Sequence, residues 1–145
     1  MNIYVKRNSF NYDGEIYTKD ILLRVEDECE CLNKVETIIQ TSEKTADFNF
    51  KNAEMHLYLI QKYMETDIDY DWDENPIEFN YEESTFIPIN YCPFCGNEIN
   101  IIVDKTVDKT KEVTPLMDEL KKLRKKKKIK NSYIVRKQIN QLMLQ

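Results

Sequence analysis

Residues 92–97 read Cys92-Pro93-Phe94-Cys95-Gly96-Asn97, and this stretch is the sharpest motif of the chain. A Cys-Pro-x-Cys-Gly segment is typical of a tight turn whose backbone amides point at the two sulfurs, with glycine relieving the backbone strain after the second cysteine. The other two cysteines, Cys29 and Cys31, form a second close pair about sixty residues earlier. Two close pairs predict one site made by four thiolates.

The Cys92–Cys95 segment resembles the knuckle of rubredoxins and zinc ribbons. Four protein ligands close the coordination sphere of zinc, so we expect a structural ion held by Cys29, Cys31, Cys92 and Cys95. The Cys-x-Cys half departs from the usual Cys-x-x-Cys pattern. Acids surround it and disfavour thiolate formation, which argues against a reactive or redox cysteine. Free structural thiols are the alternative.

The composition excludes several classes of function. The chain has 145 residues, of which 41% are hydrophobic, enough for one ordinary domain. Its two glycines exclude a G-x-G-x-x-G turn and a phosphate-binding P-loop. A single histidine, His56, excludes most acyl-transfer triads and multi-histidine metal sites. We expect His56 to be a packing or surface residue, and the chain to be no enzyme.

Charge divides the chain into two parts. Residues 1–104 carry 8 basic and 22 acidic residues, a balance of −14, whereas residues 105–145 carry 13 and 4, a balance of +9. We therefore expect an acidic, zinc-stapled α+β body over 1–104 and a basic helical extension over 105–145. The longest apolar run is far below the roughly 20 residues of a membrane helix, and Lys6 and Arg7 place charges where a signal peptide would need an apolar core. These features predict an unprocessed cytoplasmic protein.

The body is expected to contain an antiparallel sheet with one packed helix. Extended segments at 2–7 and 15–25 flank the turn residues 11–14 and predict a hairpin. A β-branched segment at 35–41 predicts a third strand. A stripe of apolar residues predicts an amphipathic helix over 52–65, capped by Asn52; the stripe consists of Ala53, Leu57, Ile60 and Met64.

The second half is expected to contain two strands and a helical pair. Segments 86–91 and 98–103 predict strands joined by the knuckle. After a polar connector at 105–113, Thr114-Pro115 has the residues that open a helix. Asn131-Ser132 is expected to end this helix and cap a second one. Apolar residues share one face of each helix, so the pair is also a candidate homodimer contact; they are Leu116, Leu120 and Leu123, then Val135, Ile139 and Leu142.

Residues 65–83 contain nine acids and no base, interleaved with aromatic and aliphatic residues. Spaced carboxylates imitate a row of phosphates, and aromatic side chains supply anchors of the kind that dominate binding energies. The candidate partner-binding residues are Asp67, Asp69, Tyr70, Asp71, Trp72 and Asp73. A solvated edge strand is the alternative. A calcium loop is disfavoured, because Trp72 occupies the place of the turn glycine and Pro76 stiffens the exit.

A basic run follows the first predicted helix. Its candidate phosphate or partner contacts are Arg124, Lys125, Lys126, Lys127 and Lys128. The alternative is a solvated helix end that complements the helix dipole. The acidic body repels a duplex, which makes direct nucleic-acid binding the less favoured interpretation.

With its Cys29-Glu-Cys31 and Cys92-Pro-Phe-Cys95-Gly knuckle, its acidic aromatic face and no catalytic constellation, the chain resembles a small phage-encoded zinc-containing anti-CRISPR protein. The resemblance implies a non-enzymatic inhibitor that binds a type II CRISPR effector nuclease of the bacterial host and prevents target DNA from loading. The alternative is a zinc-ribbon nucleic-acid-binding or regulatory protein that uses the basic C-terminal helix. A metalloenzyme would need fewer than four cysteine ligands and an open coordination position.

Overall fold

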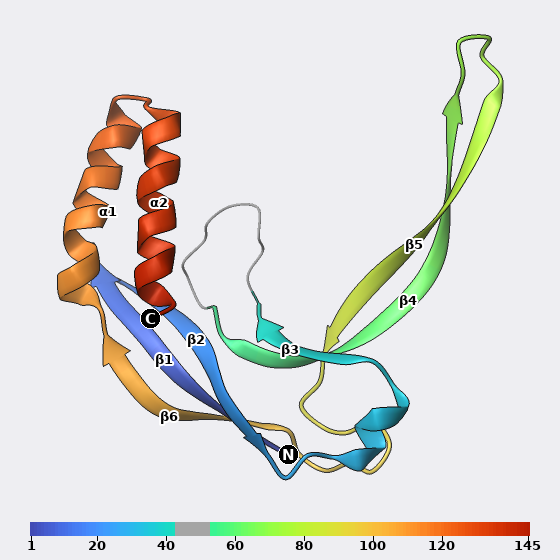
Figure 1. The fold of residues 1–145 in the computed structure, drawn as a ribbon, viewed down its shortest axis with the longest axis horizontal. Helices are drawn as coiled ribbons and strands as arrows, with labels where there is room; N and C mark the ends of the chain where they lie inside the picture. Colours follow the sequence, from blue (N-terminus) through green and yellow to red (C-terminus); the bar gives the residue numbers. More distant parts are fainter. Residues whose placement is uncertain (43–52) are drawn as a thin grey trace.

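The structure, a computed structural model, describes residues 1–42 and 53–145. In this part of the chain, six strands form two three-stranded sheets, and two α-helices follow them (Figure 1). The elements are β1 (Asn2–Tyr12), β2 (Glu15–Glu26), a 3₁₀ turn η1 (Glu30–Lys34), β3 (Thr37–Thr41), β4 (Met55–Tyr70), β5 (Pro76–Pro88), β6 (Asn100–Asp108), α1 (Thr110–Lys125) and α2 (Ile129–Met143). The predicted α+β class is confirmed.

Sheet A joins β2, β1 and β6 in that order, with β1 antiparallel to β2 and parallel to β6. The predicted opening hairpin is present, and Asp13 and Gly14 connect its strands with φ of 50° and 76°. Positive φ at both turn residues is the geometry of a type I′ turn, whose twist matches that of a hairpin. The two strands extend up to this turn, beyond the predicted bound at residue 7.

Sheet B joins β3, β4 and β5 in that order, and all its pairs are antiparallel. β3 lies where a strand was expected, but the helix predicted over 52–65 is wrong, because β4 is a strand. The expected cap, Asn52, lies outside the described residues. β3 pairs with β4 only as far as Leu59, whereas β5 continues to Tyr70.

Core packing explains why the apolar stripe at 53–64 forms a strand and not the predicted helix. Ala53, Met55 and Leu57 are buried at alternate positions, which is the two-residue period of a strand. Met64, which completes the stripe at helical spacing, is 66% exposed. The apolar residues fit both periods, and pairing with β3 and β5 selects the strand.

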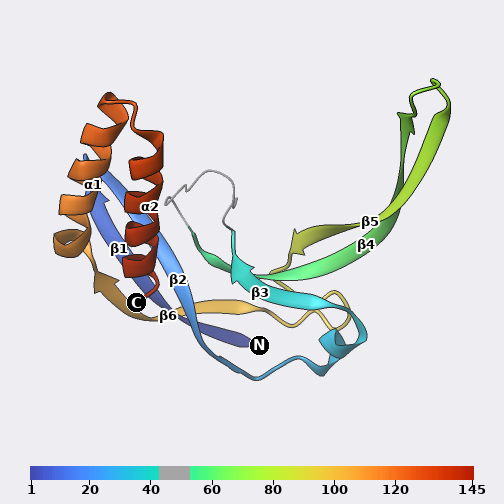
Figure 2. The same ribbon diagram turned by 45° about the horizontal axis from the view of Figure 1, so that its top comes forward.

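β1 is the central strand of sheet A and contributes to two apolar clusters of the described chain. Ile3 and Val5 pack with Leu57 and other residues between sheet A and the start of β4. Phe10 packs with buried residues of α1 and α2. Because successive strand residues face opposite sides, these two sets lie on opposite faces of the sheet. The helical pair and the start of β4 thus pack on different faces of sheet A. Figure 2 shows the helical pair near one end of the sheet A strands and sheet B toward the other end.

The helical pair predicted for the C-terminal part is present, but its first boundary differs from the prediction. α1 begins at Thr110, so Pro115 lies inside it, and the segment expected to be a connector is mostly the end of β6 and the first turn of α1. The carboxylate of Asp108 accepts hydrogen bonds from the amide and the hydroxyl of Thr110. Asp108 therefore accepts the first backbone amide of α1, a role that the sequence predicts for Thr114.

The break between the helices falls within the lysine run rather than at Asn131-Ser132. Lys127 has φ of 54°, and the amides of Lys127 and Lys128 donate to the carbonyls of Arg124 and Leu123. This is the Schellman motif, with lysine at the position that glycine usually occupies. Asn131 and Ser132 instead lie in the first turn of α2.

The knuckle connects the two sheets. The segments predicted as one pair of strands, 86–91 and 98–103, belong to different sheets, because β5 ends in sheet B and β6 begins in sheet A. An isolated bridge joins Tyr91 and Glu98. Position 104, the predicted domain boundary, lies within β6. Neither helix of the described residues has the length and apolarity needed to cross a membrane.

Candidate metal centre, acidic arm and basic helix tip

The four cysteines meet at one point. Their Sγ atoms all lie within 4.8 Å of one another, and the sulfurs of Cys29 and Cys95 are 3.5 Å apart. In a tetrahedral zinc site with Zn–S bonds of about 2.3 Å, sulfurs are about 3.8 Å apart. The observed separations therefore fit a metal ion held by four thiolates. The sequence prediction that Cys29, Cys31, Cys92 and Cys95 form one potential metal site is confirmed.

Two tight backbone turns bring the cysteine pairs together. Cys29 precedes η1, and the amide of Leu32 donates to its carbonyl at 3.1 Å. In the knuckle, the amide of Gly96 donates to the carbonyl of Cys92 at 2.9 Å, and Gly96 has φ of 76°. The Cys92 amide in turn donates to the carbonyl of Asn97 at 2.8 Å. The glycine is thus used at a left-handed position that closes the turn.

The environment favours ionisation of one thiol. Burial raises the pKa of Cys92, but hydrogen bonds from the backbone amides of Cys95 and Phe94 outweigh this effect and lower the pKa to about 7. Hydrogen bonding to the thiols of Cys95 and Cys92 raises the pKa of Cys29 to about 12. The acids expected to disfavour thiolates are exposed, so water screens them; they are Glu26, Asp27, Glu28 and Glu30.

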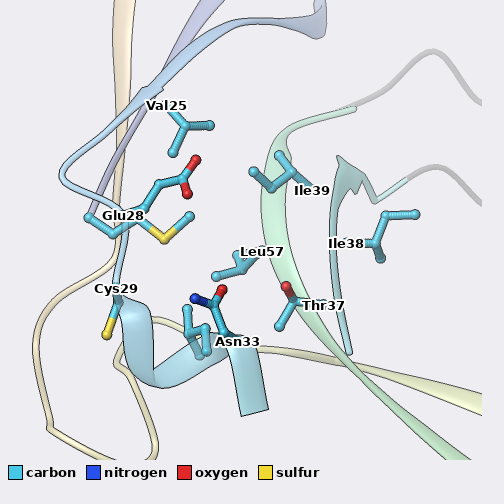
Figure 3. Close-up of a pocket in the computed structure, with 10 residues that line it drawn as sticks. Val25, Glu28, Cys29, Asn33, Thr37, Ile38, Ile39 and Leu57 are labelled. Atoms are coloured by element: carbon cyan, nitrogen blue, oxygen red, sulfur yellow. The ribbon is translucent and has the colours of Figure 1, made fainter. Parts of the chain in front are cut away.

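A cavity of about 340 Å³ lies beside this centre, between η1 and sheet B (Figure 3). Val25, Ile39 and Leu57 line its apolar wall, and the Cys29 sulfur points away from it. The cavity is therefore separate from the space between the four sulfurs.

The acidic segment forms the outer part of a β4–β5 hairpin that projects from the body as a two-stranded arm (Figures 1 and 2). We call residues 61–85 the acidic arm. Beyond the end of β3, every residue of β4 from Gln61 to Tyr70 is exposed. Strands β4 and β5 pair continuously along the arm up to Tyr70 and Pro76. An isolated two-stranded ribbon is marginally stable in water. The exposed apolar side chains of the arm, such as Ile68 and Phe79, belong to neither apolar cluster of the described residues.

The register places the arm's acids and apolar groups on shared faces. Asp67 lies opposite Phe79 and Asp69 opposite Ile77, and directly paired residues face the same side. Glu65 lies opposite Tyr81 on that face, so three carboxylates stand in a row on β4, about 7 Å apart. The hydroxyl of Tyr81 donates to both Glu65 and Asp67, each at 3.0 Å, which raises its pKa.

The six candidate partner residues are therefore not on one surface. Asp67 and Asp69 lie in the carboxylate row, Tyr70 lies on the opposite face, and the other three lie in the turn at the tip. Phe79 and Tyr81, which the sequence prediction did not include, lie on the same face as the carboxylate row. Their alternation with polar residues in β5 is the sequence pattern that indicates this shared face.

Asp71 organises the turn at the tip. Its Oδ1 accepts the amides of Asp73 and Asn75, each at 2.9 Å. Its own backbone closes the turn, since its amide donates to the Asn75 carbonyl and its carbonyl accepts from the Glu74 amide. Trp72 is fully exposed at the apex. Asp67 and Asp69 lie along a strand and so do not encircle one point, which agrees with the disfavoured calcium loop.

The basic run lies at the opposite end of the molecule, at the tip of the helical pair (Figure 1). All five candidate residues, Arg124, Lys125, Lys126, Lys127 and Lys128, are exposed. Arg124 and Lys125 lie in the last turn of α1, where cations complement the helix dipole.

His56 lies in β4 and packs edge-on against Tyr58, with ring centroids 5.9 Å apart. This contact accords with the expected packing role.

No family model, curated protein sequence or solved structure matches the chain.

Proposed function

We propose that this protein is a non-enzymatic inhibitor that inserts its acidic arm into the basic, nucleic-acid-binding channel of another protein. One observation carries the proposal: the arm projects from the body and combines a row of carboxylates with exposed aromatic side chains. The partner class implied by the resemblance is a type II CRISPR effector nuclease in the bacterial cytoplasm, where the inhibitor would block target DNA loading.

The arm has the chemistry that such a channel recognises. Its carboxylates repeat along one strand, as phosphates repeat along a nucleic-acid strand, so a lysine- and arginine-lined groove would bind them. Phe79 is 51% exposed and lies among these carboxylates, where it would contribute apolar contact area. A solvated edge strand would need the charges but gives no reason for the aromatic residues.

The four-thiolate site would hold a structural zinc ion in this protein. Four sulfur ligands leave no position for water, so the ion would stabilise the fold rather than activate a substrate. The site ties η1 to the knuckle, and Cys92 is part of the apolar cluster beneath sheet A. Zinc would thereby fix sheet B, which carries the arm, to the rest of the molecule.

The test measures target-DNA binding by guide-loaded type II effector nucleases in the presence of the purified protein. We expect stoichiometric loss of DNA binding without turnover of either partner. Asp67→Lys with Asp69→Lys should weaken inhibition at least about tenfold and flatten its salt dependence. Glu78→Lys with Glu82→Lys makes the same charge change on the opposite face and should have a much smaller effect. Equal inhibition by the Asp67/Asp69 variant would refute the role of the row.

Direct nucleic-acid binding by the helix tip is the second candidate, because its basic residues are exposed around an apolar cavity. A mobility-shift assay with the isolated protein separates the two functions. Salt-sensitive binding of DNA or RNA that Lys127→Gly and Lys128→Ser abolish would favour this candidate over the inhibitor.

A further inference from the structure

The helix tip contains a cavity of about 410 Å³ with an unusual lining. Apolar surface from Ile129 and Tyr133 forms part of it, and these side chains are 84% and 54% exposed. Four cationic residues also line it, namely Arg124, Lys127, Lys128 and Arg136. An apolar site lined by cations fits an aromatic ligand that carries carboxylates next to its ring.

The tip of the acidic arm has this composition. Trp72 is fully exposed at the apex, and Asp71, Asp73 and Glu74 stand beside it in the chain. Asp71 holds the turn through its hydrogen bonds to the amides of Asp73 and Asn75, so the indole is presented on an ordered turn rather than a loose loop. A rigid aromatic anchor loses little conformational entropy when it enters a pocket.

We propose that the tip of the acidic arm docks into the helix-tip cavity of a second copy of this chain. Charge complementarity selects this occupant, because the arm has nine acids and no base over 65–83 whereas the cavity has four cations. The arm of the same copy is excluded, since both views place the two tips on opposite sides of the molecule (Figures 1 and 2). Two reciprocal contacts would close a twofold dimer.

This self-association goes beyond the proposed function and does not rest on it. In the dimer, Trp72 would be buried among the cavity residues of the partner copy. Dissociation would expose the tip of the arm, which the dimer covers. The contact joins opposite charges at the protein surface, and added salt should therefore weaken it.

The experiment uses Trp72, which is the only tryptophan of the chain, as a fluorescent probe. We expect its emission to move to shorter wavelength as protein concentration rises, in step with a doubling of mass by sedimentation equilibrium. Lys127→Gly with Lys128→Ser should raise the dimer dissociation constant by about tenfold or more. Glycine suits the left-handed backbone of Lys127, so this variant removes the charge and keeps the helix break.

Lys105→Ser with Lys111→Ser is the matched control, because it removes two exposed charges away from the tip and should leave dimerisation unchanged. A protein that stays monomeric with water-exposed indole emission at all concentrations would overturn the proposal. A dimer that is unaffected by the Lys127/Lys128 variant would overturn it as well, and would assign the contact to another surface. The arm is intact in that variant, so loss of dimerisation with retained effector inhibition distinguishes this inference from the proposed function.

Discussion

Arg7 and Asp20 face each other across β1 and β2 and form a two-pronged ion pair. Arg7 Nε donates to Asp20 Oδ1 at 2.7 Å, and Arg7 Nη2 donates to Oδ2 at 3.0 Å. The Asp20 side chain is fully buried and also accepts the backbone amide of Met55, at 2.9 Å. One carboxylate therefore joins the hairpin of sheet A to the first residue of β4, at the base of the strand that carries the arm.

Replacing Asp20 should strongly destabilise the protein. Asp20→Ala leaves the Arg7 charge and the Met55 amide without their partner, and we expect a loss of about 3 kcal/mol of unfolding free energy in urea titration. Glu26→Ala is the matched control, because it removes an exposed ion pair with Arg24 in the same hairpin. The control should cost less than about 1 kcal/mol. Equal losses would show that the Arg7–Asp20 pair has no special role.

Removing the metal should loosen the knuckle side of the molecule first. Metal analysis of purified protein should give about one zinc per chain, and chelation under reducing conditions should speed amide exchange in the knuckle and η1. The helical pair packs on the other face of sheet A and should be affected later. Cys92→Ser should unfold or aggregate the chain, since Cys92 is both a ligand and a core residue. A metal-free protein of equal stability would contradict the structural role.

The two glycines provide a matched pair of variants at one backbone conformation. Gly14 and Gly96 both have φ of 76°, and among the described residues no heavy atom outside the glycine and its two chain neighbours lies within 4 Å of an added Cβ at either position. Each glycine-to-alanine change should therefore cost about 1 kcal/mol through the left-handed backbone alone. Gly96→Ala should also weaken zinc affinity in competition with a chromogenic chelator, whereas Gly14→Ala should not. Equal zinc affinities in the two variants would show that the turn at Gly96 does not contribute to metal binding.

The cysteine site and the hairpin were predictable because their signals are local. Cys92-x-x-Cys95-Gly and the turn at Asp13-Gly14 specify their own backbone conformations, whatever the rest of the chain does. The strand β4 was not predictable from its apolar pattern, because Ala53 and Leu57 fit both a helical and an extended period. Pairing with β3 and β5, the strands before and after β4 in the chain, decides between the periods, and the apolar pattern of residues 53–64 alone does not contain these partners.

The helix break illustrates the same limit at a smaller scale. Asn131-Ser132 has the residue types that end and cap helices, yet the chain breaks at Lys127, which is an unfavourable residue for φ of 54°. Packing of α1 and α2 on Phe10 and its neighbours fixes where the chain must reverse, and this requirement outweighs the local preference.

The positive φ of Lys127 is a conformation that glycine adopts without strain. Lys127→Gly alone should therefore raise the free energy of unfolding by about 1 kcal/mol, measured by thermal unfolding.

Asp71 should be required for the order of the arm's tip. Asp71→Ala removes the acceptor of the Asp73 and Asn75 amides, so both amides should exchange faster and the fluorescence anisotropy of Trp72 should fall. Asp73→Ala removes a neighbouring charge but leaves these two acceptor bonds in place. It should preserve the anisotropy, and a similar fall in both variants would attribute the order of the tip to charge rather than to the turn.

Tyr12 should titrate later than an ordinary tyrosine. Its hydroxyl donates to Asp118 Oδ1 at 2.7 Å, and this hydrogen bond, with smaller contributions from desolvation and nearby acids, raises the pKa of Tyr12 to about 12. A raised pKa means that the fold favours the protonated phenol. The contact between β1 and α1 thus contributes stability that is fully present below pH 10 and is lost as pH rises to about 12. In ¹³Cζ NMR titration, Asp118→Ala should return the Tyr12 pKa toward 10, whereas Glu119→Ala should leave it high. If the Tyr12 pKa stays near 12 in the Asp118→Ala variant, desolvation rather than the hydrogen bond causes the shift.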